Sequence, residues 1–560
     1  MLLGIDVGGT FTDAVIIKNS SIIKHTKKPT THGRLLDCIV TALDDVLADI
    51  NSEVITRVAL STTIATNAII ENNIDKVGLM VIPGPGADLS CLFPVKPVCL
   101  SGYTDHRGRE VSAVSDGEIG EAFRSLSKQG CEIFAISGKF AVRSPRQELQ
   151  VAEIINKQTN AKFITLGSSL TGGLNFWRRT NSAYFNSAIW RCFNNFAQAV
   201  ELALKQRNVF APVFILKADG GTIPLEVAKK FPVETIFTGP AASVLGIMAM
   251  TLPEVPTVSL DIGGTTTDIS LWNSGVPLFE RKGIKIADYP TSIRAFRIKS
   301  IGVGGDSYVR WENGKLEIGP NRLGPAMALG GSSPTVTDAL IVAGAIQFGD
   351  KKQAQVAMGQ IAGSEMNVLE ASNLVISCAV SKIHNAIITM VKELDLEPVY
   401  CVDDIVSSEQ FKPRLIIGIG GAASGLVPYL ANIMDLPYQI PCFAPVVNAV
   451  GAAIAKPTLE VNFRADTEQG VYTVAELGIK ENIPSRRFGM SEAYNMTSKY
   501  LYRRAEQAGI SVDETEIVHQ EEFNLVRGFS TVGQILTCHM QIKPGVLTAI
   551  SEMAEVNYDK

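Results

Sequence analysis

The sequence Leu2-Leu3-Gly4-Ile5-Asp6-Val7-Gly8-Gly9-Thr10-Phe11-Thr12-Asp13 decides the fold, because it opens the chain and returns, nearly copied, in the middle. Residues 260–268 read Leu-Asp-Ile-Gly-Gly-Thr-Thr-Thr-Asp, and an apolar run precedes each copy. When Asp6 is aligned with Asp261, the matching pairs are Gly8 and Gly263, Gly9 and Gly264, Thr10 and Thr265, Thr12 and Thr267, and Asp13 and Asp268. A single copy is equally compatible with an ordinary hairpin turn. Two copies in the same order predict one phosphate-binding β-hairpin used twice.

Each predicted turn has the chemistry that phosphate binding needs. A glycine pair after a strand lets the backbone approach an anion, and successive N–H groups form a concave site for phosphate oxygens. The threonines add hydroxyl donors. Asp6 and Asp261, at the strand ends, are predicted to hold a hydrated Mg²⁺ or to orient the attacking oxygen, as phosphoryl transfer requires. Asp13 and Asp268 fit two roles equally well, a place in the metal shell or a hydrogen bond to the turn backbone.

A third glycine cluster follows the predicted strand 414–419 and precedes a predicted helix. It reads Gly418-Ile419-Gly420-Gly421-Ala422-Ala423-Ser424-Gly425. Such a turn on its own is as consistent with close strand–helix packing as with ligand binding. After two phosphate hairpins it becomes the expected adenosine site. The spacing is not that of a dinucleotide-binding fingerprint, and no acidic residue follows about twenty residues later.

Composition excludes several classes of partner and site. The 560 residues are 46% hydrophobic and carry a net charge of −5 without charge runs, so we expect several globular domains and neither nucleic acid nor an anionic membrane as partner. The nine cysteines are scattered without paired spacing, which favours reduced thiols over disulfides or a zinc site. No basic segment precedes Asp6, so we expect no signal peptide and a cytoplasmic protein. The uncharged run 415–434 contains five glycine or proline residues and is predicted to be strand, turn and helix rather than a membrane span.

Two hydroxyl-rich or glycine-rich motifs precede and follow the second hairpin, at 238–242 and 301–306. A long helix is predicted over 181–207, and we place a domain change near its start. Beyond about residue 457 the pattern is more polar and repeats nothing earlier.

These motifs resemble the hydantoinase A and 5-oxoprolinase branch of the actin, Hsp70 and sugar-kinase superfamily. The resemblance is carried, in order over about residues 1–455, by Gly4 to Asp13, Ser61-Thr62-Thr63-Ile64-Ala65-Thr66-Asn67-Ala68, Asp219-Gly220-Gly221, Thr238-Gly239-Pro240-Ala241-Ala242, Asp261 to Asp268, Gly302-Val303-Gly304-Gly305, Thr335-Val336-Thr337-Asp338 and Gly420-Gly421-Ala422. The resemblance implies an α/β fold with two actin-like (ribonuclease H-like) ATPase domains. The expected units are residues 1–178, residues 179–457 with the adenosine turn, and an accessory region at 458–560.

The resemblance implies ATP-dependent opening of a cyclic amide such as a hydantoin, 5-oxoproline or a lactam, through phosphorylation of the amide oxygen. It implies ATP and Mg²⁺ as cofactors, a hydrolase B-type or other metal-binding partner subunit, and an oligomer. Relatives in acetone carboxylase activate a ketone instead, so the acceptor is not fixed by the fold. A small-molecule kinase and a non-catalytic nucleotide-dependent switch or assembly protein remain as alternatives.

The expected site residues fall into three groups. Asp6 and Asp261 are the expected catalytic and metal-binding residues. The expected nucleotide-binding residues are Gly8, Gly9, Thr10, Thr12, Gly263, Gly264, Thr265, Thr266, Gly304, Gly305, Gly420, Gly421 and Ala422. The family pattern would turn the helix start at 62–71 toward the cleft, which makes Thr62, Thr63, Asn67 and Glu71 candidate substrate residues.

Two further pairs of residues keep two interpretations each, and one further segment departs from the family pattern. Asp105 and Arg107 could bind a polar substrate, although an exposed turn is favoured. Thr337 and Asp338 either cap a helix or face the nucleotide. The segment 324–331 reads Gly-Pro-Ala-Met-Ala-Leu-Gly-Gly and lacks the cysteine and arginine that relatives often carry there, which leaves the substrate and the partner open.

Overall fold

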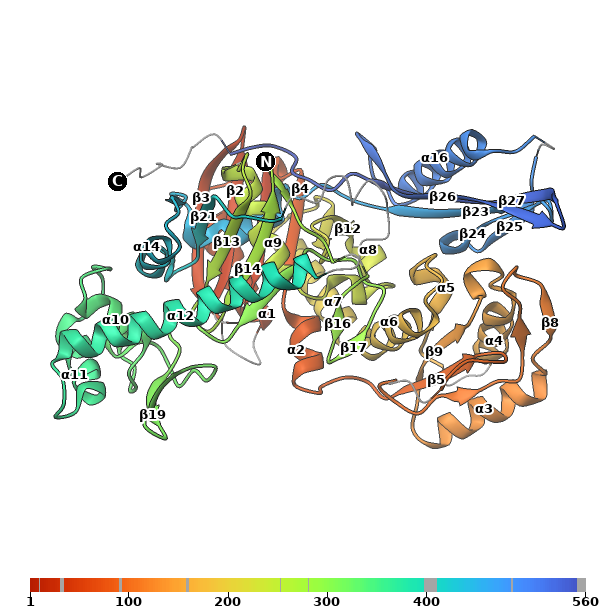
Figure 1. Cartoon of the computed structure of the whole chain (residues 1–560). Helices are drawn as coiled ribbons and strands as arrows, with labels where there is room; N and C mark the ends of the chain where they lie inside the picture. Colours follow the sequence, from red (N-terminus) through yellow and green to blue (C-terminus); the bar gives the residue numbers. More distant parts are fainter. Residues whose placement is uncertain are drawn as a thin grey trace.

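The computed structural model describes residues 1–9, 11–30, 35–89, 93–157, 161–251, 253–280, 282–396, 410–484 and 487–550. Two related sheets, an inserted layer and a C-terminal sheet make up the molecule (Figure 1). In Figure 1 the inserted layer lies at the lower right and the C-terminal sheet at the upper right.

The first sheet contains the N-terminal hairpin at its centre. Its strand order is β12-β11-β4-β1-β2-β3, with β1 antiparallel to β2 and parallel to β4. The strands are β1 (Leu2–Val7), β2 (Phe11–Lys18), β3 (Ser21–Pro29), β4 (Arg57–Thr62), β11 (Val213–Leu216) and β12 (Thr222–Pro224). Strands β1 and β2 are almost wholly buried because helices cover the sheet, which is why their sequences are nearly continuous apolar runs. The covering helices include α1 (Leu35–Leu47) and α7 (Trp190–Gln206).

The second sheet repeats this arrangement around the second hairpin. Strand β13 is antiparallel to β14 and parallel to β21, in the order β15-β14-β13-β21-β22, and β18 also pairs with β14. The strands are β13 (Thr257–Ile262), β14 (Thr267–Asn273), β15 (Val276–Pro277), β18 (Ile298–Ile301), β21 (Leu415–Ile419) and β22 (Tyr438–Gln439). The packed helices are α10 (Val336–Val342), α11 (Lys351–Ala362), α12 (Val368–Asp395) and α14 (Ala423–Met434). The predicted duplicated hairpin and the predicted strand, turn and helix at 415–434 are confirmed.

Two helices join the related sheets. Helix α9 (Thr238–Met250) and helix α15 (Val447–Ile454) share one buried core with residues of both hairpins. Their backbones pack closely, since a Cβ atom on Gly451 would lie 1.9 Å from the Ala242 carbonyl oxygen and one on Gly4 would lie 2.2 Å from that of Ala449. The small residues of α15 therefore bring the two hairpins together.

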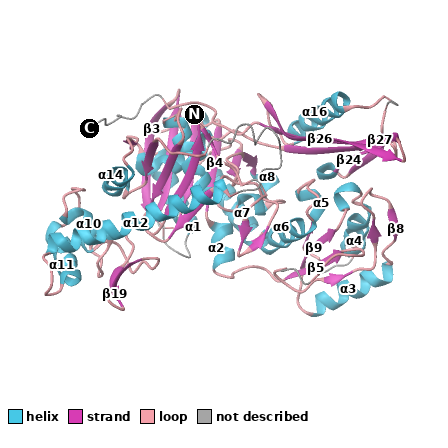
Figure 2. Cartoon of the chain, in the orientation of Figure 1, coloured by secondary structure: helices cyan, strands magenta, loops and turns pink. Residues whose placement is uncertain are grey.

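A parallel layer is inserted between β4 and β11. Its strand order is β10-β9-β5-β6, and it is flanked by helices (Figure 2). Its elements are β5 (Val77–Ile82), β6 (Val98–Cys99), β9 (Ile133–Gly138), β10 (Phe163–Leu166), α2 (Ile64–Ile70), α3 (Asp116–Lys128), α4 (Arg146–Asn156), α5 (Gly167–Leu170) and α6 (Phe176–Ala188). The described residues before 457 also form helix α8 (Leu225–Ala228) and three two-stranded ribbons: β7 (Tyr103–Thr104) with β8 (Glu110–Ser112), β16 (Lys285–Ile286) with β17 (Tyr289–Pro290), and β19 (Val309–Glu312) with β20 (Lys315–Ile318).

The C-terminal region is an antiparallel sheet with one long helix. The strand order is β25-β24-β23-β27-β26, and apolar residues of β23, β27 and α16 extend the core of the first sheet. The elements are β23 (Glu460–Asp466), β24 (Val471–Val474), β25 (Ile479–Asn482), α16 (Met490–Gln507), β26 (Thr515–Arg527) and β27 (Ser530–Ile542). Residues up to 550 then return to the core, where the Ile550 N–H bonds to the Ala249 carbonyl.

One detail of the predicted organisation, the long helix, needs correction, and the predicted domain boundary stays a prediction. The helix expected over 181–207 is two helices, α6 and α7, which meet at Ile189. The expected boundary at 178/179 lies inside α6, and the later strands β11 and β12 belong to the first sheet, because β11 pairs in parallel with β4. The second related sheet therefore begins only at β13.

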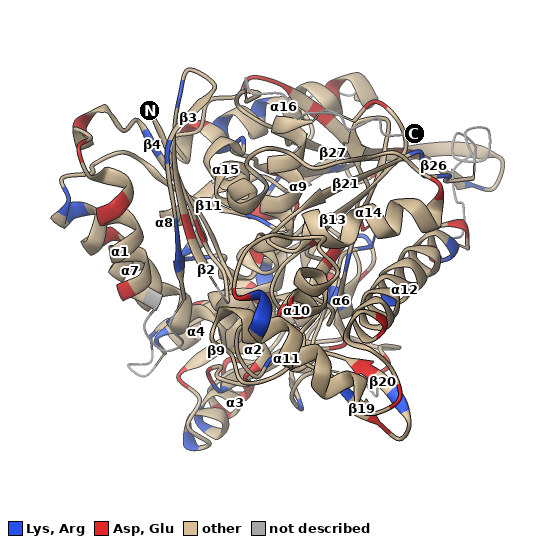
Figure 3. Cartoon of the chain, turned by 90° about the vertical axis from the view of Figure 1, so that its left-hand side faces the viewer, with Lys and Arg blue, Asp and Glu red and all other residues tan. Residues whose placement is uncertain are grey.

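One helix of the described residues, α12, is long and apolar enough to cross a membrane by length and composition. An apolar stretch of 18 residues within α12 has a mean hydropathy of 1.6, and 44% of that stretch is buried inside the protein. Its buried side packs on α10 and α14 in the second core. Both acidic and basic residues lie along α12 and around the β19–β20 ribbon (Figure 3). These features are those of a core helix. The described cysteines are free thiols.

Candidate active site between the two hairpins

The two hairpin turns close in the same way. The Gly8 N–H donates to the Phe11 carbonyl at 3.0 Å, and the Gly263 N–H donates to the Thr266 carbonyl at 3.0 Å. A Cβ atom on Gly9 would meet nothing within 4 Å, so this turn presents open backbone. Both turns line one cavity of about 510 Å³ between the related halves of the fold.

Four aspartates face this cavity in two cross-strand pairs. Asp6 lies opposite Asp13 across β1 and β2, and Asp261 lies opposite Asp268 across β13 and β14. All four line the cavity. Strand alternation places both members of a pair on the same face of the sheet, so the spacing of the repeated motif gathers the four carboxyl groups.

Two of these aspartates are held by neighbours. Asp261 Oδ2 accepts hydrogen bonds from the Ser243 hydroxyl on α9 and from Asn448 Nδ2 on α15 at 3.2 Å. Asp13 Oδ2 accepts one from Lys27 Nζ at 2.6 Å, and Lys27 also donates to the Pro445 carbonyl at 2.8 Å. The helices that join the two halves thus also orient a carboxylate of the site.

Burial and mutual repulsion raise the pKa values of three of the carboxyl groups. Burial, and then the charge of Asp13, raise the pKa of Asp6 to about 7. Burial raises the pKa of Asp13 to about 6 against the opposing effect of Lys27, and burial together with Asp261 raises that of Asp268 to about 7. The folded site therefore disfavours the ionised form of these three carboxyl groups unless a cation is present.

The residues fit a hydrated Mg²⁺. Asp6 Oδ1 and Asp13 Oδ1 are buried side-chain oxygens without a hydrogen-bond partner, and both belong to the aspartate cluster. Within the described ranges, no three His, Cys, Asp or Glu side chains are placed to hold a metal ion by themselves. Magnesium is commonly held by one or two carboxylates together with water and phosphate oxygens, so these two observations agree.

The third glycine cluster closes the same cavity. Gly420, Gly421 and Ala422 all line it. Gly420 has a φ of 91°, and a Cβ atom there would lie 2.5 Å from the Ile262 carbonyl oxygen and 2.7 Å from Asp261 Oδ1. A glycine is therefore needed for this turn to lie against the second hairpin. Three apolar residues, Pro325, Leu329 and Phe348, line the cavity as well.

The segment 302–306 braces the second turn. The Gly305 N–H donates to the Gly263 carbonyl at 2.9 Å, and a Cβ atom on Gly304 would lie 2.7 Å from that same oxygen. Gly305 lines the cavity, whereas Gly304 packs against the turn. Asp306, which pairs with Arg322 at 2.9 Å, also lines the cavity.

The structure places most of the expected nucleotide-binding residues around the cavity. Those that line it are Gly8, Gly9, Gly263, Gly264, Thr265, Thr266, Gly305, Gly420, Gly421 and Ala422. Thr10 lies outside the described residues. Thr12, which was also expected to bind the nucleotide, does not line the cavity. Its side chain is fully buried and its hydroxyl lies 3.0 Å from that of Thr30, because alternate residues of a strand point to opposite faces.

The four candidate substrate residues at 62–71 differ in whether they line the hairpin cavity. Thr63 lines the cavity. Asn67 Nδ2 donates a hydrogen bond to the Thr63 hydroxyl at 3.3 Å, so Asn67 orients Thr63. Thr62 is fully buried and Glu71 is an exposed C-cap of α2, and neither lines the hairpin cavity.

The residues for which the sequence allowed two interpretations form hydrogen bonds or ion pairs within the fold. Arg107 pairs with Asp466 and with Glu468, each at 2.6 Å, and Asp105 accepts the Arg107 and Arg109 N–H groups, so this turn ties the inserted layer to the C-terminal sheet. Asp338 forms a capping box with Thr335.

Asp338 also accepts the N–H groups of Met327 and Ala328. Thr337 lines the cavity. Sequence reasoning missed Lys27, Ser243, Asn448 and Arg322. Asn448 lies 187 positions from Asp261, whereas Lys27, Ser243 and Arg322 lie 14, 18 and 16 positions from their carboxylate partners on neighbouring elements.

Two open sheets related by a repeat, with a glycine-turn hairpin in each and a third glycine turn lining the cavity between them, define the actin-like class of folds. The predicted fold class is confirmed. Two family models match the chain, Hydantoinase/oxoprolinase N-terminal region over residues 2–159 and Hydantoinase/oxoprolinase over residues 179–461. The chain belongs to the Hydantoinase/oxoprolinase family, as the resemblance implied.

Two relatives and one solved structure show how similar the chain is to known proteins. The caprolactamase subunit alpha of Pseudomonas jessenii is 25% identical over 77% of this chain and 66% of its own length. The acetophenone carboxylase gamma subunit of Aromatoleum aromaticum is 25% identical over 61% of this chain and 53% of its own. The crystal structure of the ATP-dependent caprolactamase from Pseudomonas jessenii has a TM-score of 0.71 at 20% identity, covering 96% of this chain and 87% of that one, and so shares the fold. The alignment thus spans about two thirds of the caprolactamase subunit alpha and about half of the acetophenone carboxylase gamma subunit.

Proposed function

We propose that this chain binds ATP between its two hairpins and uses it to phosphorylate the carbonyl oxygen of a cyclic amide. The observation that supports this most is the cavity in which both turns, four aspartates and the Gly420–Ala422 turn meet. Backbone N–H groups of the turns would bind phosphate oxygens. The apolar surface of Pro325, Leu329 and Phe348 would suit a purine base.

Asp6 and Asp261 would hold Mg²⁺, which when bound neutralises charge on the transferring phosphoryl group. Ser243 and Asn448 would keep Asp261 turned toward it, because both bond to the same carboxylate oxygen. Lys27 would orient Asp13 in the same way. Closure of the two halves about α9 and α15 would exclude water from the reaction.

The proposed chemistry balances with one ATP and two water molecules. The amide oxygen attacks the γ-phosphorus, the bond from phosphorus to the β–γ bridging oxygen breaks, and ADP leaves with that oxygen. Water then adds to the activated carbon and the ring C–N bond breaks, so that the nitrogen takes a proton and an acyl phosphate remains. A second water hydrolyses the acyl phosphate to a carboxylate and inorganic phosphate.

A second acceptor class is supported by a separate observation. One relative is named acetophenone carboxylase gamma subunit, and its resemblance covers 61% of this chain. The same hairpins would then phosphorylate the oxygen of a ketone enolate for carboxylation. Lactams, hydantoins and ketones should be tested side by side for stimulation of ATP turnover.

The phosphate assay separates the proposal from a plain kinase. When any partner subunit is present, turnover with an effective acceptor should release inorganic phosphate in step with ADP. Accumulation of a stable phosphorylated product would contradict the hydrolase and favour the kinase, while slow acceptor-independent turnover with polymer formation would favour a switch. Asp261→Asn should abolish turnover with the fold intact by circular dichroism.

We also propose that the chain works as one subunit of a larger enzyme. Both relatives are named as subunits, and the described residues hold no three-ligand metal cluster of their own for activating water. A protein that co-purifies with the tagged chain from its native cells should restore acceptor-dependent ring opening. Full ring opening by the isolated chain would contradict the need for a partner.

A further inference from the structure

Among the described residues, two basic side chains line the hairpin cavity, Lys27 and Arg322. Lys27 lies on β3 directly opposite Asp13 on β2. Residues directly opposite each other on neighbouring strands point to the same face of the sheet, so the lysine shares the face of the first hairpin's carboxyl groups. The same cavity is lined by five aspartates: Asp6, Asp13, Asp261, Asp268 and Asp306.

The ammonium group of Lys27 is held where the two halves of the fold meet. Its Nζ donates to Asp13 Oδ2 at 2.6 Å and to the Pro445 carbonyl, just before α15, at 2.8 Å. It also lies 5.0 Å from the centre of the Phe11 ring. An ammonium group has three N–H donors, and contacts with the described residues use two of them. The third can reach a ligand, because the side chain is 33% exposed.

Arg322, the other cation of the hairpin cavity, is already paired. Its Nε and Nη2 donate to the same oxygen, Asp306 Oδ2, at 3.1 and 2.9 Å. Both of these donors are thus spent on one carboxylate. Lys27 is the better placed of the two cations to bind an anion that enters the cavity.

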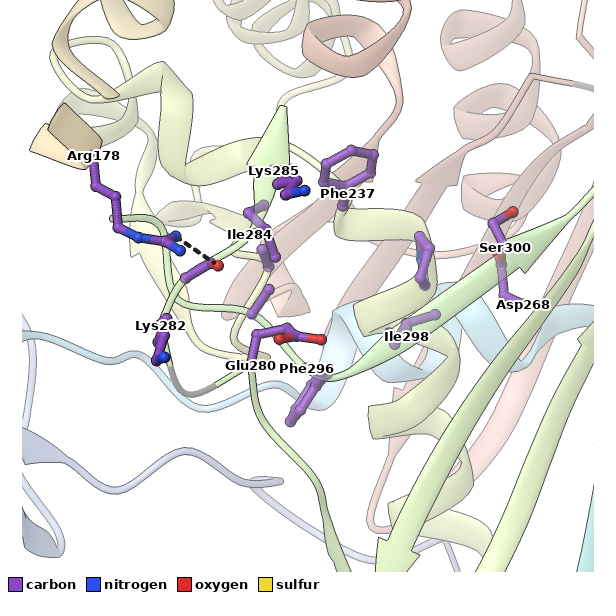
Figure 4. Close-up of a pocket in the computed structure, with 14 residues that line it drawn as sticks. Arg178, Phe237, Asp268, Glu280, Lys282, Ile284, Lys285, Phe296, Ile298 and Ser300 are labelled. Carbon is purple, nitrogen blue, oxygen red and sulfur yellow. Dashed lines mark hydrogen bonds between the residues drawn. The ribbon is translucent and has the colours of Figure 1, made fainter. Parts of the chain in front are cut away.

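A neighbouring cavity of about 770 Å³ shares Asp268 with the hairpin cavity but brings no cation to it. Figure 4 shows the three basic side chains of this neighbouring cavity away from Asp268. Arg178 is bonded to a backbone carbonyl, Lys282 points away, and Lys285 lies beside Phe237. Charge on a phosphate between the hairpins would therefore be met by Lys27.

The other lining residues determine which end of a nucleotide would meet Lys27. The glycine turn at 420–422 and the apolar residues Pro325, Leu329 and Phe348 belong to the second half of the fold. Lys27 belongs to the first sheet. A nucleotide with its base on the second half would extend its phosphates across the cavity toward the first half. Its terminal phosphate would then lie nearest to Lys27.

From these contacts we infer that Lys27 is a catalytic residue that binds the transferred phosphoryl group of ATP. The ammonium group would keep its bond to Asp13 and direct its third N–H to an oxygen of the terminal phosphate. A cation in that place stabilises the charge on the phosphoryl oxygens during transfer. The inference rests on the proposed function for the presence of ATP. It adds the side chain that distinguishes ATP from ADP.

A comparison of two nucleotides tests the inference by binding rather than by turnover. ADP and a non-hydrolysable ATP analogue, each with Mg²⁺, should be titrated by calorimetry into the full chain and into Lys27→Met. The substitution should weaken binding of the ATP analogue about ten- to hundredfold, because a hydrogen bond to a charged group is lost, and should change ADP binding by less than about twofold. Retained ADP binding also shows that the variant is folded.

Two further variants complete the test. Lys28→Met is the matched control, because Lys28 is the next residue on β3, pairs with Asp45 of α1 and does not line the cavity. It should bind both nucleotides as the wild type does. Lys27→Gln keeps an N–H donor without the charge, should also lose affinity for the ATP analogue selectively, and replaces Lys27→Met if that variant does not fold.

Equal losses of affinity for ADP and for the ATP analogue would overturn the inference, because they would mean that the lysine only holds the site together. Unchanged binding of both nucleotides, or the same selective loss in Lys28→Met, would overturn it as well. If the wild type binds neither nucleotide, the proposed function itself fails. If the wild type binds both and the Lys27 variants show no selective loss, the proposed nucleotide site stands and only the role of Lys27 falls.

Discussion

Replacing Asp6 by Asn should make the nucleotide-free protein more stable while removing its activity. Burial and Asp13 raise the pKa of Asp6 from 3.8 to about 7 in the folded chain. Between these two values the folded state binds more protons than the unfolded state, so stability falls as pH rises. The stabilising contribution is complete below about pH 4 and is lost by the time the pH passes about 7.

The size of the effect follows from the width of that window. Each pH unit inside it costs about 1.4 kcal/mol, so the penalty of Asp6 grows by about 2.7 kcal/mol between pH 5 and pH 7 and then levels off. Asn has nearly the shape of the protonated acid and does not ionise. The stability advantage of Asp6→Asn over the wild type should therefore be roughly 2–3 kcal/mol larger at pH 8 than at pH 5.

Urea unfolding at both pH values, followed by tryptophan fluorescence in the absence of nucleotide, measures this difference. Asp513→Asn is the control, because Asp513 is exposed in the loop before β26. The same Asp6→Asn protein should lose ATP turnover. Two results would refute the proposal that ionisation of the buried Asp6 destabilises the folded protein: a stability difference that is the same at pH 5 and pH 8, or an Asp6→Asn protein that is less stable than the wild type at pH 8.

Three further outcomes are expected. Gly420→Ala should lower the free energy of unfolding by about 1–3 kcal/mol and weaken ATP-analogue binding, because Gly420 has a φ of 91° and a Cβ atom there would lie 2.5 Å from a carbonyl oxygen. Gly421→Ala is the control, because a Cβ atom there meets nothing within 4 Å, and urea unfolding should show unchanged stability. Arg107→Met should cost roughly 3 kcal/mol, because it leaves the buried Asp466 without its cation, and an equal loss in the exposed Arg109→Met would show that the ion pair is not the cause. An Mg²⁺–ATP analogue at a hundred times its dissociation constant should stabilise the wild type by about 2.7 kcal/mol and leave Asp261→Asn nearly unchanged, as thermal unfolding would show.

Short sequence patterns predicted those parts of the site that neighbouring residues in the chain form. The repeated strand, glycine pair and aspartate placed Asp6 and Asp261 correctly in one cavity, and the third glycine turn lies there too. The direction of Thr12 could also have been predicted, because it alternates with Asp13 along a strand that is buried on both faces.

Long-range packing accounts for part of what sequence reasoning missed. Asn448 reaches Asp261 across 187 positions, and Arg107 finds Asp466 across 359. The inserted layer separates β4 from β11, so the first sheet could not be completed from neighbouring segments.

The Mg²⁺ dependence of ATP-analogue binding tests the central claim most directly. Calorimetric titration of a non-hydrolysable ATP analogue, with and without Mg²⁺, should be compared between the wild type and Asp261→Asn. We predict that Mg²⁺ tightens binding to the wild type at least tenfold and that Asp261→Asn loses this gain while keeping its fold. An undiminished Mg²⁺-dependent gain in Asp261→Asn, or no binding of the analogue to the wild type, would contradict the account.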